Sequence, residues 1–360
     1  MRTLTRQEAI DILYGCTVLG TGGGGSLSRG LQMINADYDD GKALKLIPLD
    51  EISDDAMVAT PYGCGASAFE GAEEDEKYKH LPRLKDSAAV LAYKTLEEYM
   101  GKAFSVVSST ELGGENTAEA MHIAMQLDLP ISDSDPAGRS VPELQHSTYY
   151  ILGEPITPMG IATNFGETII IKDVVDDMRA EEIVRAIAIA SGDEVGVADH
   201  PMDGRTFKKS VIPGCISYSL AIGRILREEK ENAAYKIAES FNGKILFKGK
   251  ISETDWECSD GFNNGSICLT GTDDFKNETY SIYMQNENLY SRRNDILDAC
   301  VPDLICMIDE CGAPVTNPNW KQGQNVYIIG LPAPEIWKTP KGCEVFSAKS
   351  FGFDFDYKEF

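Results

Sequence analysis

Residues 103–143 constrain the fold more than any other segment, because strand and helix patterns alternate there with little sequence between them. Residues 103–109 form a β-branched apolar run, residues 116–127 have the spacing of an amphipathic helix, and residues 129–132 form a second apolar run. This order is typical of a βαβ unit, whose strands lie parallel in one sheet. The sequence therefore predicts an open α/β sheet in the N-terminal part.

A different pattern begins near residue 172. Two helix-like segments are followed by short strand-like runs with turn residues between them, at 244–250, 266–269, 280–284, 304–308 and 326–329. Such spacing indicates a mostly antiparallel sheet, and 360 residues exceed what one core usually holds. We therefore predict two domains. Residues 1–171 form an α/β domain with a parallel or mixed sheet, and residues 172–360 form a β-rich α+β domain.

The charge of the chain excludes several classes of partner. Lysine and arginine number 33 against 57 aspartates and glutamates, a formal net charge of −24, which repels nucleic acids and anionic membranes. No apolar stretch reaches the roughly 20 residues of a membrane span, and the N-terminus lacks the apolar core of a secretory signal. We expect a cytoplasmic homo-oligomer that acts on a small molecule, without a nucleic-acid or membrane partner.

The nine cysteines are scattered and form no C-x-x-C pair, which indicates reduced thiols without a disulfide framework or structural zinc. Cys64 lies in a glycine-rich stretch and Cys215 near an expected helix start, so either could be a nucleophile. Burial as inert thiols is the alternative that we favour for both residues.

A glycine-rich loop at residues 20–25 precedes an expected helix. Its spacing formally satisfies the dinucleotide fingerprint, but that motif needs a strand before it, for which only residues 16–19 are available. The preceding segment has a helical pattern, so we expect no nucleotide cofactor. Instead we predict that the backbone amides of Gly22, Gly23, Gly24 and Gly25 bind substrate or a developing negative charge. A tight turn between two helices is the structural alternative.

Acidic residues follow both strands of the βαβ unit: Glu111 after the first, and Asp133, Asp135 and then Glu143 after the second. The carboxyl ends of parallel strands share one edge of a sheet, so we expect these side chains to converge. Neighbouring carboxylates raise each other's pKa, which suits general acids and bases near neutral pH. We predict all four as catalytic residues; capping and solvated loop charge are the alternative.

Four further side chains are predicted to bind substrate. Arg139 offers a planar double donor for a carboxylate or ring carbonyl, and Asn116 opens the helix of the βαβ unit. His146 follows Glu143 by three positions, and His200 lies in a loop-like segment. The acidic pair could also hold one divalent cation through oxygen ligands, although the sequence assigns no metal ligand.

Motifs along nearly the whole chain have the order and spacing of one known family. They are Gly20-Thr21-Gly22-Gly23-Gly24-Gly25, Glu111-Leu112-Gly113-Gly114 with Asn116, Asp133-Ser134-Asp135 with Gly138-Arg139 and Pro142-Glu143, Pro201-Met202, Pro213-Gly214, Gln285-Asn286-Glu287-Asn288, Pro302-Asp303-Leu304-Ile305, Gly330-Leu331-Pro332-Ala333-Pro334 and Gly352-Phe353-Asp354-Phe355-Asp356-Tyr357. On these residues the chain resembles the family catalogued as domain of unknown function 917 and later named for S-methyl thiohydantoin desulfurase.

The resemblance implies an N-terminal α/β domain, a β-rich C-terminal domain, and hydrolysis of an S-methylated thiohydantoin to a hydantoin with release of methanethiol. Members are also similar to proteins found beside hydantoinase and oxoprolinase subunits. A noncatalytic ligand-binding or regulatory subunit of such an assembly is therefore the alternative function. Two features depart from the family: residues 68–86 are longer and more acidic, and His146 stands where an apolar residue is common.

The implied reaction assigns roles to the predicted residues. Water must add to the carbon between two ring nitrogens, with Glu111 or Asp133 as base, and the intermediate must expel the thiol, with Asp135 or Glu143 as acid. The glycine loop and Arg139 would meet the developing negative charge, and a bound metal could replace the base. This mechanism requires the loop to face the acids across one pocket.

Overall fold

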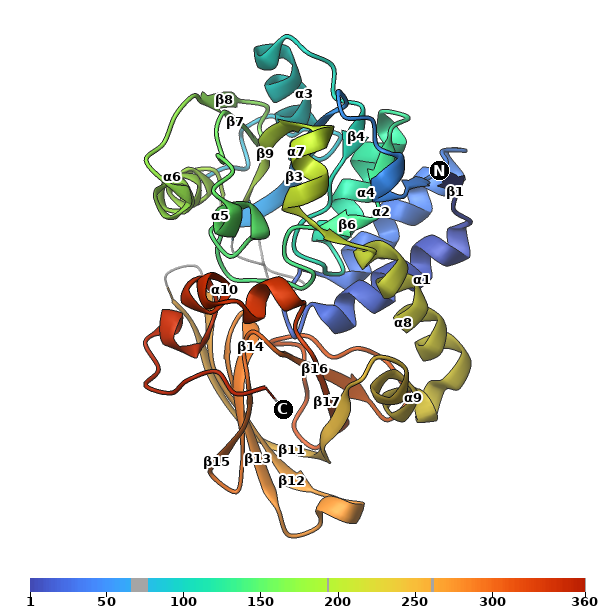
Figure 1. The fold of residues 1–360 in the computed structure, drawn as a ribbon, viewed down its shortest axis with the longest axis vertical. Helices are drawn as coiled ribbons and strands as arrows, with labels where there is room; N and C mark the ends of the chain where they lie inside the picture. The colour runs from blue at the N-terminus through green and yellow to red at the C-terminus, as the bar shows by residue number, and fades with distance from the viewer. Residues whose placement is uncertain (66–76, 193, 260–261, 360) are drawn as a thin grey trace. The chain divides into compact units, whose positions relative to one another are not determined.

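The computed structural model describes residues 1–65, 77–192, 194–259 and 262–359 (Figure 1). The chain forms two compact units that interleave in sequence. The first comprises Met1–Ala9, Gly25–Ala137 and Glu143–Ile216, and the second comprises Ile10–Gly24, Gly138–Pro142 and Ser217–Phe360. The units therefore do not coincide with a single cut after residue 171. The sequence also predicts a solvated surface loop for the acidic stretch at residues 70–76, which lies outside the described residues.

The first unit contains an eight-stranded mixed sheet in the order β1-β2-β5-β4-β3-β9-β7-β8. Its strands are β1 (Arg2–Thr3), β2 (Lys45–Ile47), β3 (Met57–Gly65), β4 (Val106–Val107), β5 (Pro130–Ser132), β7 (Met159–Thr163), β8 (Thr168–Ile171) and β9 (Glu194–Asp203). The neighbours β2, β5, β4 and β3 run parallel, whereas β9 joins β3 and β7 antiparallel. The predicted α/β class with a mixed sheet is confirmed.

The predicted βαβ unit is also confirmed. Its helix is α4 (Asn116–Gln126), and its strands β4 and β5 pair in parallel through Val107 and Ile131. Another helix, α2 (Leu27–Asp39), packs on α4. The carboxyl ends of β4 and β5 therefore share one edge of the sheet, where the sequence predicts the acidic residues.

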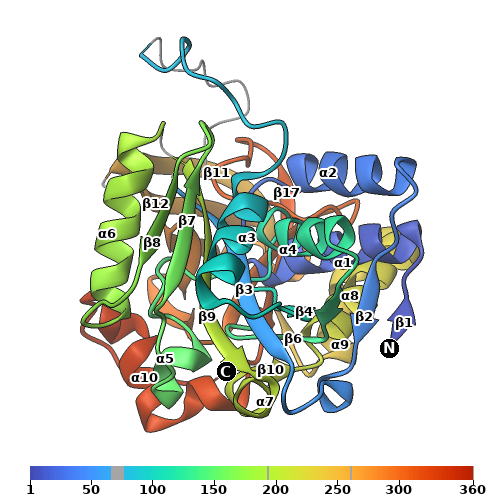
Figure 2. The same cartoon turned by 90° about the horizontal axis from the view of Figure 1, so that it is seen from above.

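Helices cover both faces of this sheet (Figure 2). On one face α3 (Ala88–Met100) lies so close that a Cβ added at Gly196 would stand 2.1 Å from the backbone nitrogen of Ala89. On the other face Val195 and Val197 pack in one apolar cluster with residues of α6 (Asp177–Ala190). Successive strand residues point to opposite faces. Gly196 therefore leaves room for α3 on one face, while Val195 and Val197 pack against α6 on the other.

The loop at residues 20–25 joins two helices. α1 (Arg6–Leu19) extends through residues 16–19, and Ser26 caps α2 by accepting a hydrogen bond from the Arg29 N–H. Residues 16–19 are therefore helical, as the sequence pattern predicts, and they do not supply the strand that a dinucleotide fingerprint requires before Gly20. The apolar spacing of α1 continues to the loop, and a helix satisfies its backbone without partner strands.

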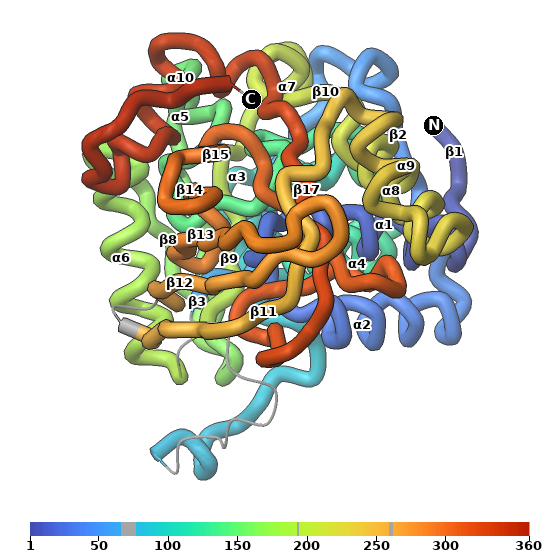
Figure 3. Tube along the Cα trace, turned by 90° about the horizontal axis from the view of Figure 1, so that it is seen from below, coloured from blue at the N-terminus to red at the C-terminus, as the bar shows by residue number. Residues whose placement is uncertain are grey.

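The second unit contains a seven-stranded antiparallel sheet in the order β15-β14-β13-β12-β11-β17-β16 (Figure 3). The predicted β-rich, mostly antiparallel class is confirmed. The strands of this sheet are β11 (Lys244–Ser259), β12 (Phe262–Gly271), β13 (Thr279–Gln285), β14 (Glu287–Arg293), β15 (Ile296–Cys300), β16 (Leu304–Asp309) and β17 (Asn325–Leu331). Phe247, Tyr280 and Ile328 belong to the apolar cluster buried by this sheet. The second of the two helix-like segments found in the sequence, residues 215–241, is divided into α8 (Cys215–Glu229) and α9 (Ala233–Ser240).

Shorter elements complete the described chain. They are β6 (Ser134–Asp135), which pairs with β10 (Ile212–Pro213), and the helices α5 (Thr148–Leu152), α7 (Gly204–Ser210) and α10 (Pro340–Val345). Among the described residues no helix has both the length and the apolar character needed to cross a membrane.

Candidate functional site

Asp135 lies at the predicted sheet edge, but its contacts are those of a turn. Its side chain is fully buried. One carboxylate oxygen accepts a hydrogen bond from the Ser109 hydroxyl at 3.0 Å, and the other accepts one from the Ala137 N–H at 2.8 Å. These contacts join the ends of β4 and β5. They agree with the capping alternative, and a catalytic role for Asp135 stays a prediction.

Glu111 and Asn116 are brought together at the same edge. The Asn116 amide donates to Glu111 Oε2 at 3.2 Å, and the backbone of Glu111 has a positive φ of 55°. Burial raises the pKa of Tyr62 well above its usual value, and the charges of Asp199 and Glu111 add to this effect. The carboxylate of Glu111 therefore acts electrostatically on the inner strand β3.

A hydrogen-bonded chain of three side chains links β3 to β9. The Tyr62 hydroxyl donates to Asp199 Oδ2 at 2.6 Å, and Asp199 Oδ1 lies 2.9 Å from His200 Nδ1. All three residues are buried. The Asp199 carboxylate accepts a hydrogen bond from Nδ1, which keeps the proton of the neutral imidazole on that nitrogen. Nε2 is therefore the basic atom of His200.

The backbone at His200 is irregular, which changes the direction of its side chain. β9 has a bulge against β3, because Val58 pairs with Met202 while Thr60 pairs with Asp199, and His200 lies in this bulge with a positive φ of 44°. Bulges and left-handed non-glycine residues are concentrated near functional sites, where they redirect a side chain.

Tyr149 of α5 holds the imidazole in place. The Tyr149 and His200 rings stack with centroids 4.3 Å apart. The Tyr149 hydroxyl is 3.2 Å from the Thr60 hydroxyl and 3.3 Å from the Ser108 hydroxyl. This stacking restricts rotation of the ring, so Nε2 keeps one direction.

The open side of His200 faces Asp177, at the start of α6. His200 Nε2 and Asp177 Oδ2 are 3.8 Å apart, and both are buried without a hydrogen-bond partner in the described part of the chain. Burial raises the pKa of Asp177 to about 6, against the opposing effect of the nearby imidazole. One donor placed about 2.9 Å from each atom would satisfy both acceptors, and a water molecule has the two O–H groups required.

Glu143 and His146 lie near each other, as the spacing predicts. His146 Nε2 is 3.9 Å from Glu143 Oε2, within a turn in which the His146 N–H donates to the backbone oxygen of Glu143. Burial, aided by the charge of Glu181, raises the pKa of Glu143. Asp133 is half-buried, and its backbone oxygen accepts from the Gly214 N–H. No contact among these ties Glu143 or Asp133 to His200.

The glycine loop and Arg139 are brought together in the second unit. The Arg139 guanidinium is fully buried and donates four hydrogen bonds: to Thr21 Oγ1 and to the backbone oxygens of Ser140, Pro302 and Asp303. Arg139 therefore holds the loop through Thr21. Gly25 differs from the rest of the loop because it belongs to the first unit, against the Glu115 side chain.

Beside this loop lies Glu287, at the start of β14, which the sequence analysis assigned no role. Its Oε1 accepts from the Ser140 hydroxyl at 2.8 Å, whereas Oε2 is buried without a partner among the described residues. A Cβ added at Gly23 would stand 1.7 Å from Oε1. Complete burial raises the pKa of Glu287 to about 7, so the neutral and ionised forms are both populated near neutral pH.

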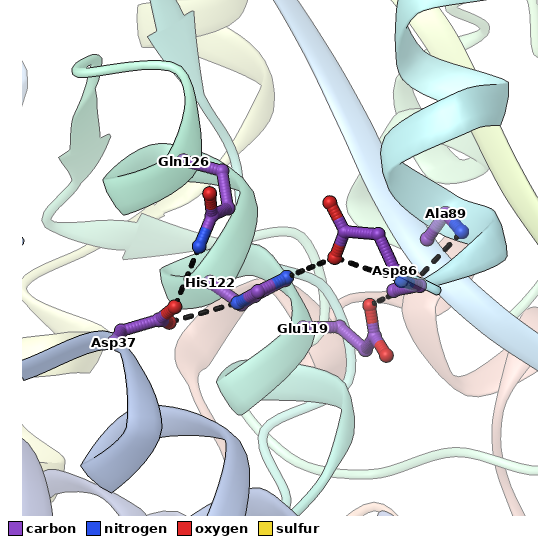
Figure 4. A network of polar contacts seen from close by, with 7 residues as sticks. Asp37, Asp86, Ala89, Glu119, His122 and Gln126 are labelled. Carbon is purple, nitrogen blue, oxygen red and sulfur yellow. Dashed lines mark hydrogen bonds and ion pairs between the residues drawn. The ribbon is translucent and has the colours of Figure 1, made fainter. Parts of the chain in front are cut away.

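A second histidine cluster in the first unit has a different character (Figure 4). His122 of α4 lies between two carboxylates, with Nδ1 2.8 Å from Asp37 and Nε2 2.7 Å from Asp86. Gln126 also donates to Asp37 at 2.7 Å. Hydrogen bonds to both carboxylates outweigh the effect of burial and raise the pKa of His122 to about 9. Both ring nitrogens are satisfied, which indicates a clamp that joins α2, α4 and the start of α3.

Thiol and metal chemistry gain no specific support. Cys64 is buried, and burial raises the pKa of its thiol far above the usual value. Cys215 is also buried and donates to the Ile212 oxygen at 3.3 Å. Within the described ranges no group of three or more His, Cys, Asp or Glu side chains is arranged to hold a metal ion.

Comparison with known proteins gives the family. The model for "S-Me-THD-like, N-terminal domain" matches residues 7–173, and that for "S-Me-THD-like, C-terminal domain" matches residues 175–360. The chain belongs to the S-Me-THD-like family. The suspected relation to S-methyl thiohydantoin desulfurase-like proteins is thereby confirmed.

A solved structure shares the fold of this S-Me-THD-like chain. It is described as the X-ray crystal structure of a protein from Chromobacterium violaceum, a structural-genomics target, with a TM-score of 0.81, 21% sequence identity and 99% coverage of both chains. At this identity the likeness shows the fold alone. Similarity searching finds no match among curated proteins.

Sequence reasoning missed four residues of these sites: Tyr62, Asp177, Asp199 and Glu287. Asp199 directly precedes His200, and this adjacency was the one signal that could have found the pair. Glu287 belongs to a motif that carried the family resemblance, without a role. Tyr62 and Asp177 are far from His200 in sequence and reach it only through strand pairing and the packing of α6.

Proposed function

We propose that this S-Me-THD-like chain hydrolyses a small nitrogen heterocycle of the S-methyl thiohydantoin type, giving a hydantoin and methanethiol. The family supports the substrate class. One observation carries the reaction: His200 Nε2 and Asp177 Oδ2 are buried, 3.8 Å apart, and without a hydrogen-bond partner among the residues that the structure describes. Two such acceptors suit one water molecule, the co-substrate of a hydrolase.

A water held by both acceptors donates its two O–H groups to them and keeps its lone pairs for attack. As its oxygen bonds to the ring carbon between the two nitrogens, Nε2 of His200 accepts one proton. Asp199 stabilises the imidazolium that forms, and the Tyr62 hydroxyl holds the other oxygen of Asp199. The arrangement resembles the histidine and aspartate of a catalytic triad, with water in place of the serine.

Collapse of the tetrahedral intermediate breaks the carbon–sulfur bond. The proton on His200 passes to sulfur, which leaves as methanethiol. Glu143 gives its proton to a ring nitrogen and takes up the second proton of the water in exchange. The carbon keeps the oxygen of the water as a carbonyl. Burial raises the pKa of Glu143, which favours the protonated form required of an acid at nitrogen. Glu111 and Asp133 remain alternative bases and Asp135 an alternative acid.

Methanethiol release tests this proposal directly. The purified chain is incubated with an S-methyl thiohydantoin, and the thiol is trapped with a chromogenic disulfide. We expect steady turnover that falls at least about 100-fold in Asp177→Asn, because the amide presents an N–H group as well as an oxygen to the water. Asp173→Asn is the matched control, since Asp173 is an exposed aspartate just before α6, and it should keep full activity.

The same experiment separates the alternatives. Binding of the ring compound, seen as thermal stabilisation, with no thiol released would favour a noncatalytic subunit, and co-purification with a larger enzyme would add to that case. Loss of turnover after treatment with EDTA, restored by a divalent cation, would favour metal-activated water over His200 as the base.

A further inference from the structure

The glycine loop of the second unit is held rigidly from three sides. The Asn288 N–H donates to the Thr21 oxygen, and the Asn317 N–H donates to the Gly22 oxygen, each at 2.8 Å. The Gly23 N–H donates to the Gly20 oxygen at 2.8 Å. These bonds, together with the one from Arg139, fix the conformation of the loop before any ligand arrives.

The loop and Glu287 together leave several polar groups unsatisfied. Gly22 and Gly24 are buried with positive φ values of 102° and 81°, and neither N–H has an acceptor among the described residues. Glu287 Oε2 is equally without a partner, although its side chain is fully buried. Buried polar groups in proteins nearly always find a partner, so several orphans beside one loop require an explanation.

Protonation of Glu287 would make its carboxyl group a hydrogen-bond donor, like the N–H groups of Gly22 and Gly24. A neutral carboxyl donates from Oε2, so all three unsatisfied groups become hydrogen-bond donors, and the buried Arg139 adds a positive charge nearby. Side-chain acceptors here are already used, because Glu287 Oε1 accepts from Ser140 and Asn317 Oδ1 accepts from Trp320. A group of unsatisfied donors suits an acceptor, and a carboxylate combines two acceptor oxygens with a compensating negative charge.

We infer that the glycine loop and Glu287 form a binding site for the carboxylate group of a small molecule, with Glu287 as the proton-carrying partner. This inference concerns the second unit alone and goes beyond the proposed hydrolysis. A side chain at position 23 would displace the Glu287 carboxyl group, because its Cβ would stand 1.7 Å from Oε1.

Binding of acetate and propionate to the whole chain tests this inference without any turnover. Calorimetry with each salt, against sodium chloride and methylammonium chloride, should detect the two carboxylates only. Ionised Glu287 repels a carboxylate and donates no hydrogen bond. With its pKa near 7, the affinity should therefore fall about 30-fold between pH 6 and pH 8.5.

Glu287→Gln keeps a neutral donor of the same shape, so it should bind acetate with the same affinity at both pH values. Glu119→Gln is the matched control: Glu119 is a half-buried acid whose pKa desolvation also raises to about 7, but it lies in the first unit beside Ser87. This control should keep the pH dependence of the wild type. Absence of acetate binding at pH 6, or the same pH dependence in Glu287→Gln as in the wild type, would overturn the inference.

A spectroscopic measurement on the wild type covers the case in which Glu287→Gln does not fold. In the chain labelled with ¹³C at glutamate carboxyls, the resonances of Glu287 and Glu119 should both titrate near pH 7. Only the resonance of Glu287 should move when acetate is added. Carboxyl resonances that are all indifferent to acetate would contradict the site. Hydrolytic activity enters neither measurement, so this inference and the proposed function fail independently.

Discussion

Two buried histidines of the first unit lie between carboxylates, yet they have opposite characters. Both nitrogens of His122 are hydrogen-bonded, at 2.8 Å and 2.7 Å, whereas His200 has one bonded nitrogen and one that faces Asp177 across 3.8 Å. His122 also occupies a regular helix, while His200 lies in a bulge with a positive φ. The comparison teaches that the unsatisfied atom, rather than the histidine itself, marks a place for chemistry.

The largest expected effect is on the rate of catalysis. If substitutions of the two histidines changed this rate equally, the contrast between them would be wrong. His200→Gln should lower the rate of methanethiol release about 10³-fold, since a general base typically contributes 10²–10⁴-fold. His122→Gln should keep turnover within about threefold of the wild type at a temperature where it is folded, because His122 has no unsatisfied nitrogen to offer. Steady-state kinetics measures both rates. Equal losses of methanethiol release in the two variants would refute the distinction between the histidines.

The second effect concerns stability, for which we expect His122 to matter more than His200. His122→Gln should lower the free energy of unfolding by about 3 kcal/mol, because it leaves the buried carboxylate of Asp37 without its cationic partner. Urea denaturation followed by circular dichroism measures this change. A destabilisation below about 1 kcal/mol would show that the clamp contributes little to folding.

The third effect sharpens the comparison through pH. The pKa of His122 is raised to about 9 in the folded chain, against about 6.5 when unfolded. The folded state therefore binds the proton more tightly, so this stabilisation is complete below pH 6.5 and is lost as the pH rises through 9. This stabilisation is on the order of 2 kcal/mol, because solvent screens the half-exposed carboxylate of Asp86 and weakens its interaction with His122. The difference in urea midpoint between wild type and His122→Gln should shrink from pH 6 to pH 9.5, and a constant difference would contradict the assignment.

Much of the fold could be predicted from the sequence because its signals are local. The apolar runs of β4 and β5 and the spacing of α4 identified the βαβ unit, and the regular short strands identified the antiparallel sheet. The same approach could not find that β9 pairs with β3, because partner residues such as Thr60 and Asp199 are far apart in the sequence and leave no local pattern. That pairing keeps residues 172–216 in the first unit.

The candidate sites were predicted less completely. The sequence identified His200 and the glycine loop, but it interpreted the glycines as freedom for a turn or a ligand. The structure adds a physical reason: Asn317 and Glu287 approach Gly22 and Gly23 so closely that a Cβ would stand 2.2 Å and 1.7 Å from their side-chain atoms. Such approaches come from distant segments, so they are invisible in the loop itself. The predicted meeting of the loop with the acids of the first unit stays a prediction.

The sequence by itself determined the α/β and β-rich classes of the two domains and the family, because periodicity and motif spacing are properties of neighbouring residues. Only the tertiary structure decided which polar groups are left unsatisfied. Tyr62 and Asp199 are separated by 137 positions, and the charge state of Glu287 depends on burial by segments far from it in sequence. Hydrogen bonding and desolvation act through space, so the burial and the hydrogen-bond partners of His200 and Glu287 are set only by folding.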